Sequence, residues 1–253
     1  MSHILKELLL FFSIFLLLSC EKHQDIYFKD FAVVSAKIEA SEAGYEILKM
    51  GGNAFDAMIA TDLALAVVYP NAGNLGGGGF MVYRTADGDY GSLDYREKAP
   101  LASTKDMYLD EDNNVVKGLS SEGALSIGVP GTVAGLFETY QRFGSLPLDS
   151  LFKPAMKLAK HGFPLTKKQA KSFNQNKRKI LSNSNNIDLF KKDFIEGMVF
   201  NNPALYSTLK FILENGKDGF YGGRISDDII EFTASKGGIL SKKDFLSYKP
   251  IWR

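Results

Sequence analysis

Cysteine and histidine are scarce in this sequence. Its 253 residues include one cysteine, Cys20, and three histidines, His3, His23 and His161. A single cysteine excludes an internal disulfide framework, and so few imidazoles at these spacings form no metal-ligand pattern. We therefore expect neither a metal site nor a bound cofactor.

An excess of charge of either sign is also missing. The 30 Lys and Arg residues balance 29 Asp and Glu residues, which leaves a formal net charge of +1. This balance gives no electrostatic reason to expect nucleic acid as a partner. With 45% hydrophobic residues, the composition is that of a globular protein, and a chain of this length buries roughly 70–75% of its unfolded surface.

A long apolar run occurs only near the amino terminus. The segment LLLFFSIFLLL (8–18) is short for a membrane span and is typical of a signal peptide. It leads into LLSC (17–20), which resembles a bacterial lipobox with Cys20 as the lipidated residue. We expect a signal peptide at 1–19, a tether at 20–29 and a lipoprotein of the bacterial cell envelope that contacts the membrane through its lipid. An uncleaved anchor and a plain secretory signal are the alternatives.

Hydrophobic periodicity and capping residues predict one domain, 30–253, that is mainly helical in its second half. The helix at 54–68 is apolar almost all round, so we place it in the interior. Extended segments are expected at 31–36, 78–84, 90–95 and 125–129, the middle two forming a hairpin around an Asp-Gly turn. Helices are expected at 40–50, 54–68, 130–143, 148–161, 203–216 and 226–236, with a basic helix after Thr166 and a short one capped by Ser241 and Asp244.

Four consecutive glycines, 76–79, stand directly before the first hairpin strand. Successive glycine N–H groups can cradle a phosphate. Here, however, no Lys-Ser/Thr follows, and the G-x-G-x-x-G spacing fails at Met81. The run also precedes a strand, whereas nucleotide-binding glycine motifs precede a helix. A nucleotide-binding module is therefore the weakest hypothesis, and close packing against neighbouring backbone is the expected role.

Patterns of the common hydrolases are missing as well. There is no G-x-S-x-G elbow and no serine–histidine pairing typical of a triad. The acidic groups at 110–112 and 227–228 and the basic stretch at 167–179 are explained by solvated turns and helix faces. Arg96, which ends the second hairpin strand, is the one candidate we single out, because a guanidinium can bind a carboxylate through two parallel hydrogen bonds.

Three blocks together resemble the large subunit of the γ-glutamyltranspeptidases, also called glutathione hydrolases. They are GGNAFDAMIATDLALAVVYPNAGNLGGGGFMVYR (51–84), LDYREKAP (93–100) and GVPGTVAGL (128–136), and later pieces follow the family's order as far as Tyr248. The resemblance implies an α+β fold of the N-terminal-nucleophile hydrolase type, with αββα layers. This chain would be a partial large subunit with a helix-rich carboxyl-terminal half.

The resemblance also implies a mechanism. The family's precursor cleaves itself and exposes a threonine, which attacks the γ-glutamyl amide of glutathione or related compounds and forms an acyl-enzyme. The arginine of the family's D-[FY]-R-E-x-A-P segment binds the α-carboxylate of the glutamyl group, and it falls on Arg96. It is the substrate-binding residue that the resemblance assigns to this chain.

The family's catalytic threonine lies at a T-T-H-like junction downstream of Arg253. We therefore expect no catalytic residue in this chain, a small subunit of the same precursor as its partner, and no activity for the chain alone. The alternative is a non-catalytic, membrane-anchored remnant or binding protein that retains the scaffold and Arg96.

Overall fold

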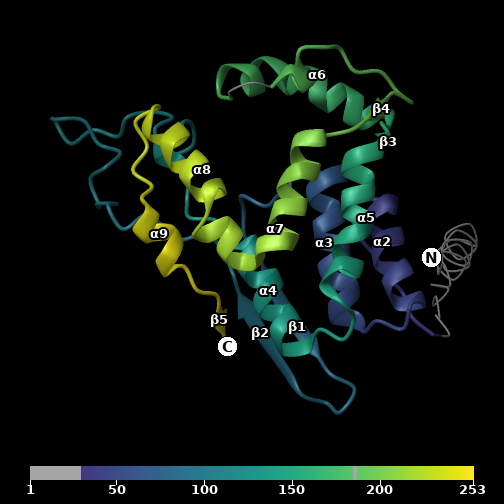
Figure 1. Cartoon of the computed structure of the whole chain (residues 1–253). Coiled ribbons are helices and arrows are strands. Elements are labelled where there is room, and N and C mark those ends of the chain that lie inside the picture. The colour runs from purple at the N-terminus through teal and green to yellow at the C-terminus, as the bar shows by residue number, and fades with distance from the viewer. Residues whose placement is uncertain (1–29, 185–186) are drawn as a thin grey trace, which may run out of the picture. The chain divides into compact units, whose positions relative to one another are not determined.

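The computed structural model describes residues 30–184 and 187–253, and its compact unit Val33–Arg253 carries the elements labelled in Figure 1. The expected signal peptide, the tether and the lipidation site Cys20 lie outside the described residues. Among the described residues, no helix combines the length and the apolar character needed to cross a membrane.

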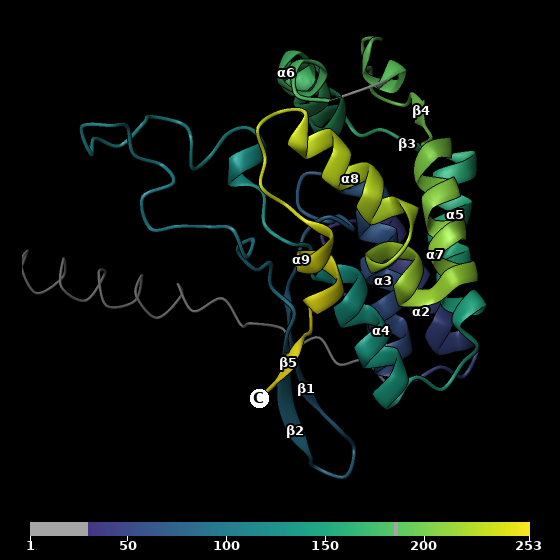
Figure 2. The ribbon, with the colours of Figure 1, turned by 60° about the vertical axis from the view of Figure 1, so that its left-hand side comes forward.

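Helices are the main kind of secondary structure in the unit (Figures 1 and 2). The α-helices are α2 (Ile38–Lys49), α3 (Ala54–Val68), α4 (Thr132–Phe143), α5 (Leu148–His161), α6 (Lys167–Ser182), α7 (Pro203–Tyr221), α8 (Arg224–Ala234) and α9 (Lys242–Ser247). Two short 3-10 helices are η1 (Ala124–Ser126) and η2 (Asp188–Phe190). The strands are β1 (Phe80–Arg84), β2 (Tyr90–Asp94), β3 (Phe163–Pro164), β4 (Val199–Phe200) and β5 (Ile251–Trp252).

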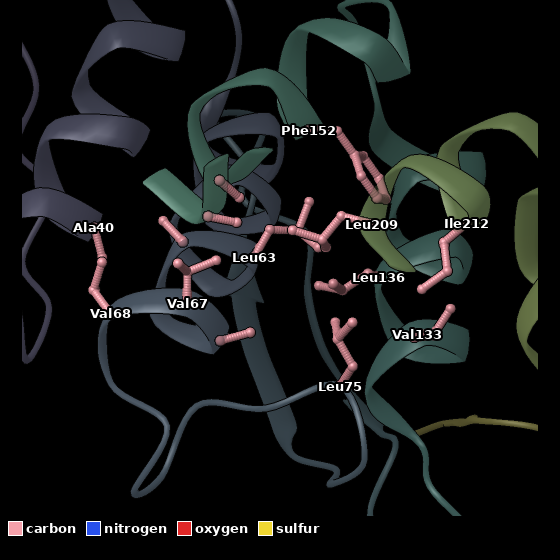
Figure 3. Close-up of a cluster of buried hydrophobic side chains, with 14 of the residues drawn as sticks. Ala40, Leu63, Val67, Val68, Leu75, Val133, Leu136, Phe152, Leu209 and Ile212 are labelled. Atoms are coloured by element: carbon pink, nitrogen blue, oxygen red, sulfur yellow. The ribbon is translucent and has the colours of Figure 1, made fainter. Parts of the chain in front are cut away.

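Helix α3 lies inside the helical layer, as its apolar sequence predicts. It packs against α2, α4 and α5, and Figure 3 shows its side chains Leu63 and Val67 among those of the neighbouring helices. The facing side chains include Leu136 from α4, Phe152 from α5 and Leu209 from α7, all of them buried. Because most of the α3 surface is removed from water, burial rather than intrinsic propensity stabilises this helix.

The start of α3 is fixed by a capping box that Asn53 and Asp56 form. Asn53 Oδ1 accepts hydrogen bonds from the backbone N–H groups of Phe55 and Asp56, and the Asp56 carboxylate accepts one from Asn53 N at 3.0 Å. Asp56 is fully buried and also accepts hydrogen bonds from the backbone and the hydroxyl of Ser145. The same carboxylate therefore ties the start of α3 to the connection between α4 and α5.

A three-stranded antiparallel sheet in the order β1-β2-β5 carries the expected hairpin. Phe80 pairs with Asp94, and Leu93 pairs with Trp252 from the carboxyl end of the chain. The face that carries Met81, Leu93 and Trp252 packs against Phe55, Met58 and Phe143 of the helical layer. Since neighbouring residues of a strand point to opposite faces, the other face of the sheet carries Phe80 and Val82, which are 61% and 84% exposed.

Two expected strands do not form. Residues 31–35 are irregular, and Val34 is 89% exposed, because the described residues provide no partner strand for this segment. At 125–129 the chain forms η1 and then a single bridge between Val129 and Lys98. A strand needs a neighbouring strand for its backbone hydrogen bonds, and a local sequence pattern cannot supply one.

Several helix boundaries also differ from the prediction by a few residues. Gly216 has φ 66° and ψ −161°, so it breaks the helical geometry as expected, but helical residues resume after it and α7 continues to Tyr221. Helix α8 begins and ends two residues earlier than its predicted range of 226–236. The predicted caps at Thr166, which begins α6, and at Ser241, which begins α9, are confirmed, and each is part of a capping box.

Candidate functional site

Arg96 lies two residues beyond the end of β2, where the chain leaves the sheet. Tyr95, which precedes it, still exchanges two backbone hydrogen bonds with Gly79, at 3.0 and 3.3 Å. Arg96 N then donates to Asp94 Oδ1 at 3.2 Å, which turns the backbone away from the strand direction. The side chain of Arg96 is exposed, and its Cζ lies 5.7 Å from the ring centre of Phe80, on the uncovered face of the sheet.

The glycine run is packed against the backbone that carries Arg96. A β-carbon on Gly78 would lie 2.5 Å from the carbonyl oxygen of Tyr95 and 2.8 Å from Glu97 N, and one on Gly79 would lie 2.9 Å from the Tyr95 ring. The expected close approach of backbones is therefore confirmed at Gly78. At Gly76, by contrast, the nearest atom would be 3.8 Å away.

The beginning of α4 closes the other side of this segment. Added β-carbons on Gly131 and Gly135 would overlap the carbonyl oxygen and the ring of Tyr95. Gly131 N and Thr132 N donate to the carbonyl oxygen of Gly77 at 2.7 and 3.0 Å. Because these N–H groups are already hydrogen-bonded within the chain, they are not available to cradle a phosphate.

A tyrosine from the carboxyl-terminal part of the chain holds the main chain of Arg96. Tyr248 Oη donates a hydrogen bond to the carbonyl oxygen of Arg96 at 2.7 Å. The Tyr248 ring is stacked on that of Tyr221, with 5.7 Å between ring centres and 11° between planes. The sequence contained this residue in the stretch GGILSKKDFLSYKP, but nothing in the local pattern indicated its contact with Arg96.

Asp94 is close enough to Arg96 for the two charges to interact, but the two side chains form no ion pair. Asp94 forms an ion pair with Arg253 at 2.9 Å. The hydrogen bond from Arg253, and after it the one from Arg96 N, lower the pKa of Asp94. Among the described residues, no carboxylate lies within ion-pair distance of the Arg96 guanidinium, whose described side-chain contact is the Phe80 ring. A planar cation of this kind is free to bind an external carboxylate.

A second acidic group lies beneath this segment, on α3. Burial raises the pKa of Asp62 to about 6. Burial also raises the pKa of Tyr95, and the nearby charge of Asp62 raises it further. An acid within the apolar run 57–68 was visible in the sequence, but its position next to Tyr95 was not. The described residues contain no group of three or more His, Cys, Asp and Glu side chains that could hold a metal ion.

Two cavities among the described residues lie away from Arg96. One of about 440 Å³ is lined by residues of α6, including Phe173 and Asn176, and another of about 430 Å³ lies between α6 and the segment 121–127. Neither contains Arg96. The exposed Arg96 side chain lies over Phe80 on the open face of the sheet, so the described residues provide at most one wall of a binding site.

Solved structures establish the fold class. The crystal structure of Helicobacter pylori γ-glutamyltranspeptidase matches with a TM-score of 0.86 and 42% identity, covering 90% of this chain and 67% of that chain. A helical layer that covers one face of an antiparallel sheet is therefore part of an N-terminal-nucleophile hydrolase fold, and the predicted α+β class is confirmed.

Sequence comparison then gives the family. The model described as Gamma-glutamyltranspeptidase matches residues 40–253. Glutathione hydrolase proenzymes from Pseudomonas sp. (strain A14) and Pseudomonas aeruginosa are 44% and 40% identical over 86% and 88% of this chain. The chain belongs to the γ-glutamyltranspeptidase family. It spans 38% and 40% of the lengths of these two relatives.

Proposed function

We propose that the intact protein is a γ-glutamyltransferase or glutathione hydrolase, and that this chain contributes Arg96 as the ligand for the α-carboxylate of the γ-glutamyl group. A threonine on a small subunit of the same precursor would form the acyl-enzyme, and water or an amino-acid acceptor would release it. The proposal rests on family membership and, within the chain, on one observation: the Arg96 guanidinium is exposed and has no ion-pair partner among the described residues, while its main chain is held from three sides.

The three contacts come from different parts of the fold. Gly78 and Gly131 press on the backbone next to Arg96, and Tyr248 binds its carbonyl oxygen. A rigid support reduces the conformational entropy that the arginine loses when it binds a ligand. The Phe80 ring below the guanidinium adds a cation–π contact that restricts the side chain further.

Replacing Arg96 in the intact enzyme tests this proposal. Loss of one partner of a desolvated, hydrogen-bonded charge pair costs about 2–5 kcal/mol. We therefore expect Arg96→Lys to lower kcat/KM for a γ-glutamyl anilide by about 30-fold or more, because lysine cannot form the two parallel hydrogen bonds. Unchanged kinetics would refute the role of Arg96.

A second experiment, which combines calorimetry with an assay of product release, separates the enzyme from the non-catalytic alternative. An intact protein that binds glutamate in calorimetry, loses that binding in Arg96→Ala and never releases product from glutathione would be a binding protein. Product release by the unmodified intact protein would exclude that alternative.

We also propose that Cys20 is lipidated and anchors the protein to a bacterial envelope membrane. The support is the lipobox-like sequence LLSC (17–20) at the end of an apolar run. Mass spectrometry of the mature amino terminus should find acyl chains on Cys20, and a Cys20→Ser variant should leave the membrane fraction. An unmodified Cys20 in the mature protein would contradict the proposal.

A further inference from the structure

The hydrogen bond between Tyr248 and Arg96 joins two segments that lie 152 positions apart in the sequence. Tyr248 follows α9 directly, and its side chain is buried within the main hydrophobic cluster. Burial also raises the pKa of its phenol, so the hydroxyl stays protonated and can donate to the Arg96 carbonyl at any physiological pH.

The ring of Tyr248 is held in place by its neighbours. It stacks on Tyr221, whose hydroxyl donates to the carbonyl oxygen of Pro130 at 2.8 Å and accepts from Ala134 N at 3.2 Å. Both partners of Tyr221 belong to the segment that begins α4. Tyr248 is therefore connected, through one stacked ring, to the same helix start whose glycines press on Tyr95.

Lys98 makes a further contact with the Tyr248 ring. Its Nζ lies 5.0 Å from the ring centre and donates to the carbonyl oxygen of Lys249 at 2.8 Å. The backbone of Lys98 exchanges two hydrogen bonds with Val129, at 2.7 and 3.2 Å. The main chain on both sides of Arg96 is thus fixed by the sheet and by Val129, and Tyr248 supplies the hydrogen bond at Arg96 itself.

We propose that Tyr248 is a positioning residue for donor binding, which holds the Arg96 main chain so that the guanidinium meets the α-carboxylate of the γ-glutamyl group. Tyr248 acts through Arg96 and does not touch the substrate. The inference rests on the proposed function of Arg96 and extends it to a residue at the far end of the chain.

The test compares two tyrosines in the intact enzyme. Tyr248→Phe removes the hydroxyl but keeps the stacked ring, so the variant is expected to fold. Tyr140→Phe is the matched control, because Tyr140 Oη also donates to a main-chain carbonyl, that of Leu146, at 3.1 Å. Thermal melting of both variants reports the structural cost of losing one such hydrogen bond.

Kinetics with a γ-glutamyl anilide then reports positioning. If the Arg96 guanidinium is displaced, the donor substrate binds more weakly, and equally so in the ground state and the transition state. KM therefore rises while kcat is unchanged. From the usual net value of one hydrogen bond, we expect KM to rise about 3- to 10-fold in Tyr248→Phe. Tyr140→Phe should leave KM unchanged, even if its melting temperature falls by as much.

A double-mutant cycle shows whether Tyr248 acts through Arg96. Once Arg96→Ala has removed the guanidinium, adding Tyr248→Phe should raise KM no further. If Tyr248→Phe raised KM equally in the wild-type and the Arg96→Ala enzyme, or in neither, Tyr248 would not be a positioning residue. The proposed role of Arg96 would remain intact. If Arg96→Ala itself leaves KM unchanged, the proposed function fails first, and the inference fails with it.

Discussion

Gly78 lies against the carbonyl oxygen of Tyr95 so closely that a β-carbon would come within 2.5 Å of it. Because the obstacle is backbone held in a sheet, it cannot move aside as a side chain would. We expect Gly78→Ala to lower the free energy of unfolding of the intact protein by about 1–3 kcal/mol, measured by urea unfolding.

The glycine run itself provides the control for this prediction. A β-carbon on Gly76 would have its nearest neighbour at 3.8 Å, the side chain of Asn74, so Gly76→Ala should be close to neutral. Gly77→Ala should fall between the two, because its β-carbon would meet the Asn74 side chain at 2.7 Å. Equal losses at Gly76 and Gly78 would show that close packing is not the reason for the run.

Asp62 makes stability depend on pH in an unusual direction. Burial raises its pKa from 3.8 to about 6, so the folded state binds the proton more tightly than the unfolded state does. The stability that protonated Asp62 contributes is complete below about pH 4 and is lost as the pH rises through about 6. Asp62→Asn should therefore stabilise the protein at pH 8 and have little effect at pH 4.

The expected gain at pH 8 is about 1–2 kcal/mol, which is less than the full shift in pKa implies, because the side chain keeps some exposure. Melting temperatures of both proteins across pH 4 to 8 measure it. A difference that does not change with pH would contradict the shifted pKa of Asp62.

Asp244 makes stability depend on pH in the opposite direction to Asp62. Its carboxylate accepts hydrogen bonds from Leu101 N at 2.6 Å and from the backbone and hydroxyl of Ser241 at 2.7 and 2.6 Å. Burial works against ionisation, but the hydrogen bonds from Ser241 and Leu101 outweigh it and lower the pKa of Asp244. Its contribution is therefore present above about pH 4, the unfolded pKa, and is lost as the pH falls through the folded pKa.

Replacing the Asp244 carboxylate should reduce the free energy of unfolding most at neutral pH. Asp244→Asn is expected to lower the free energy of unfolding by about 1.5–3 kcal/mol at pH 7, the usual value of hydrogen bonds to a charged group. The loss should shrink as the pH falls through the lowered pKa of the folded Asp244, because the wild-type carboxyl then becomes neutral as well. Asp228→Asn, at an exposed position of α8, is the control and should change little at either neutral or acidic pH.

Local signals in the sequence predicted those elements that depend on local interactions. The side chains of Asn53 and Asp56 each accept a hydrogen bond from the other's backbone N–H within one helical turn. The hairpin follows from an Asp-Gly turn whose Gly88 has φ 95°. The strand expected at 31–36 had a suitable composition but needed a partner strand, which no local pattern can specify. Burial of α3 was predictable because almost every side chain in it is apolar.

The candidate site was predictable only in part. The position of Arg96 at a strand end followed from the hairpin, and its role followed from the resemblance. Its support by Tyr248 depends on a contact across 152 positions, and the tight fit around Tyr95 depends on how α4 meets the sheet. The Arg96 side chain is exposed among the described residues, and enclosing it would require surfaces from elements outside this sheet.

The outer strand of the sheet has a practical consequence for handling the molecule. Within the described residues β1 pairs only with β2, so its other edge presents unpaired N–H and C=O groups beside an exposed Val82. A free edge of this kind is a template for pairing with a strand of a second copy, so we expect a preparation of this chain to form oligomers. A lysine in place of Val82 would repel such a neighbour by charge and should keep a preparation of this chain monodisperse.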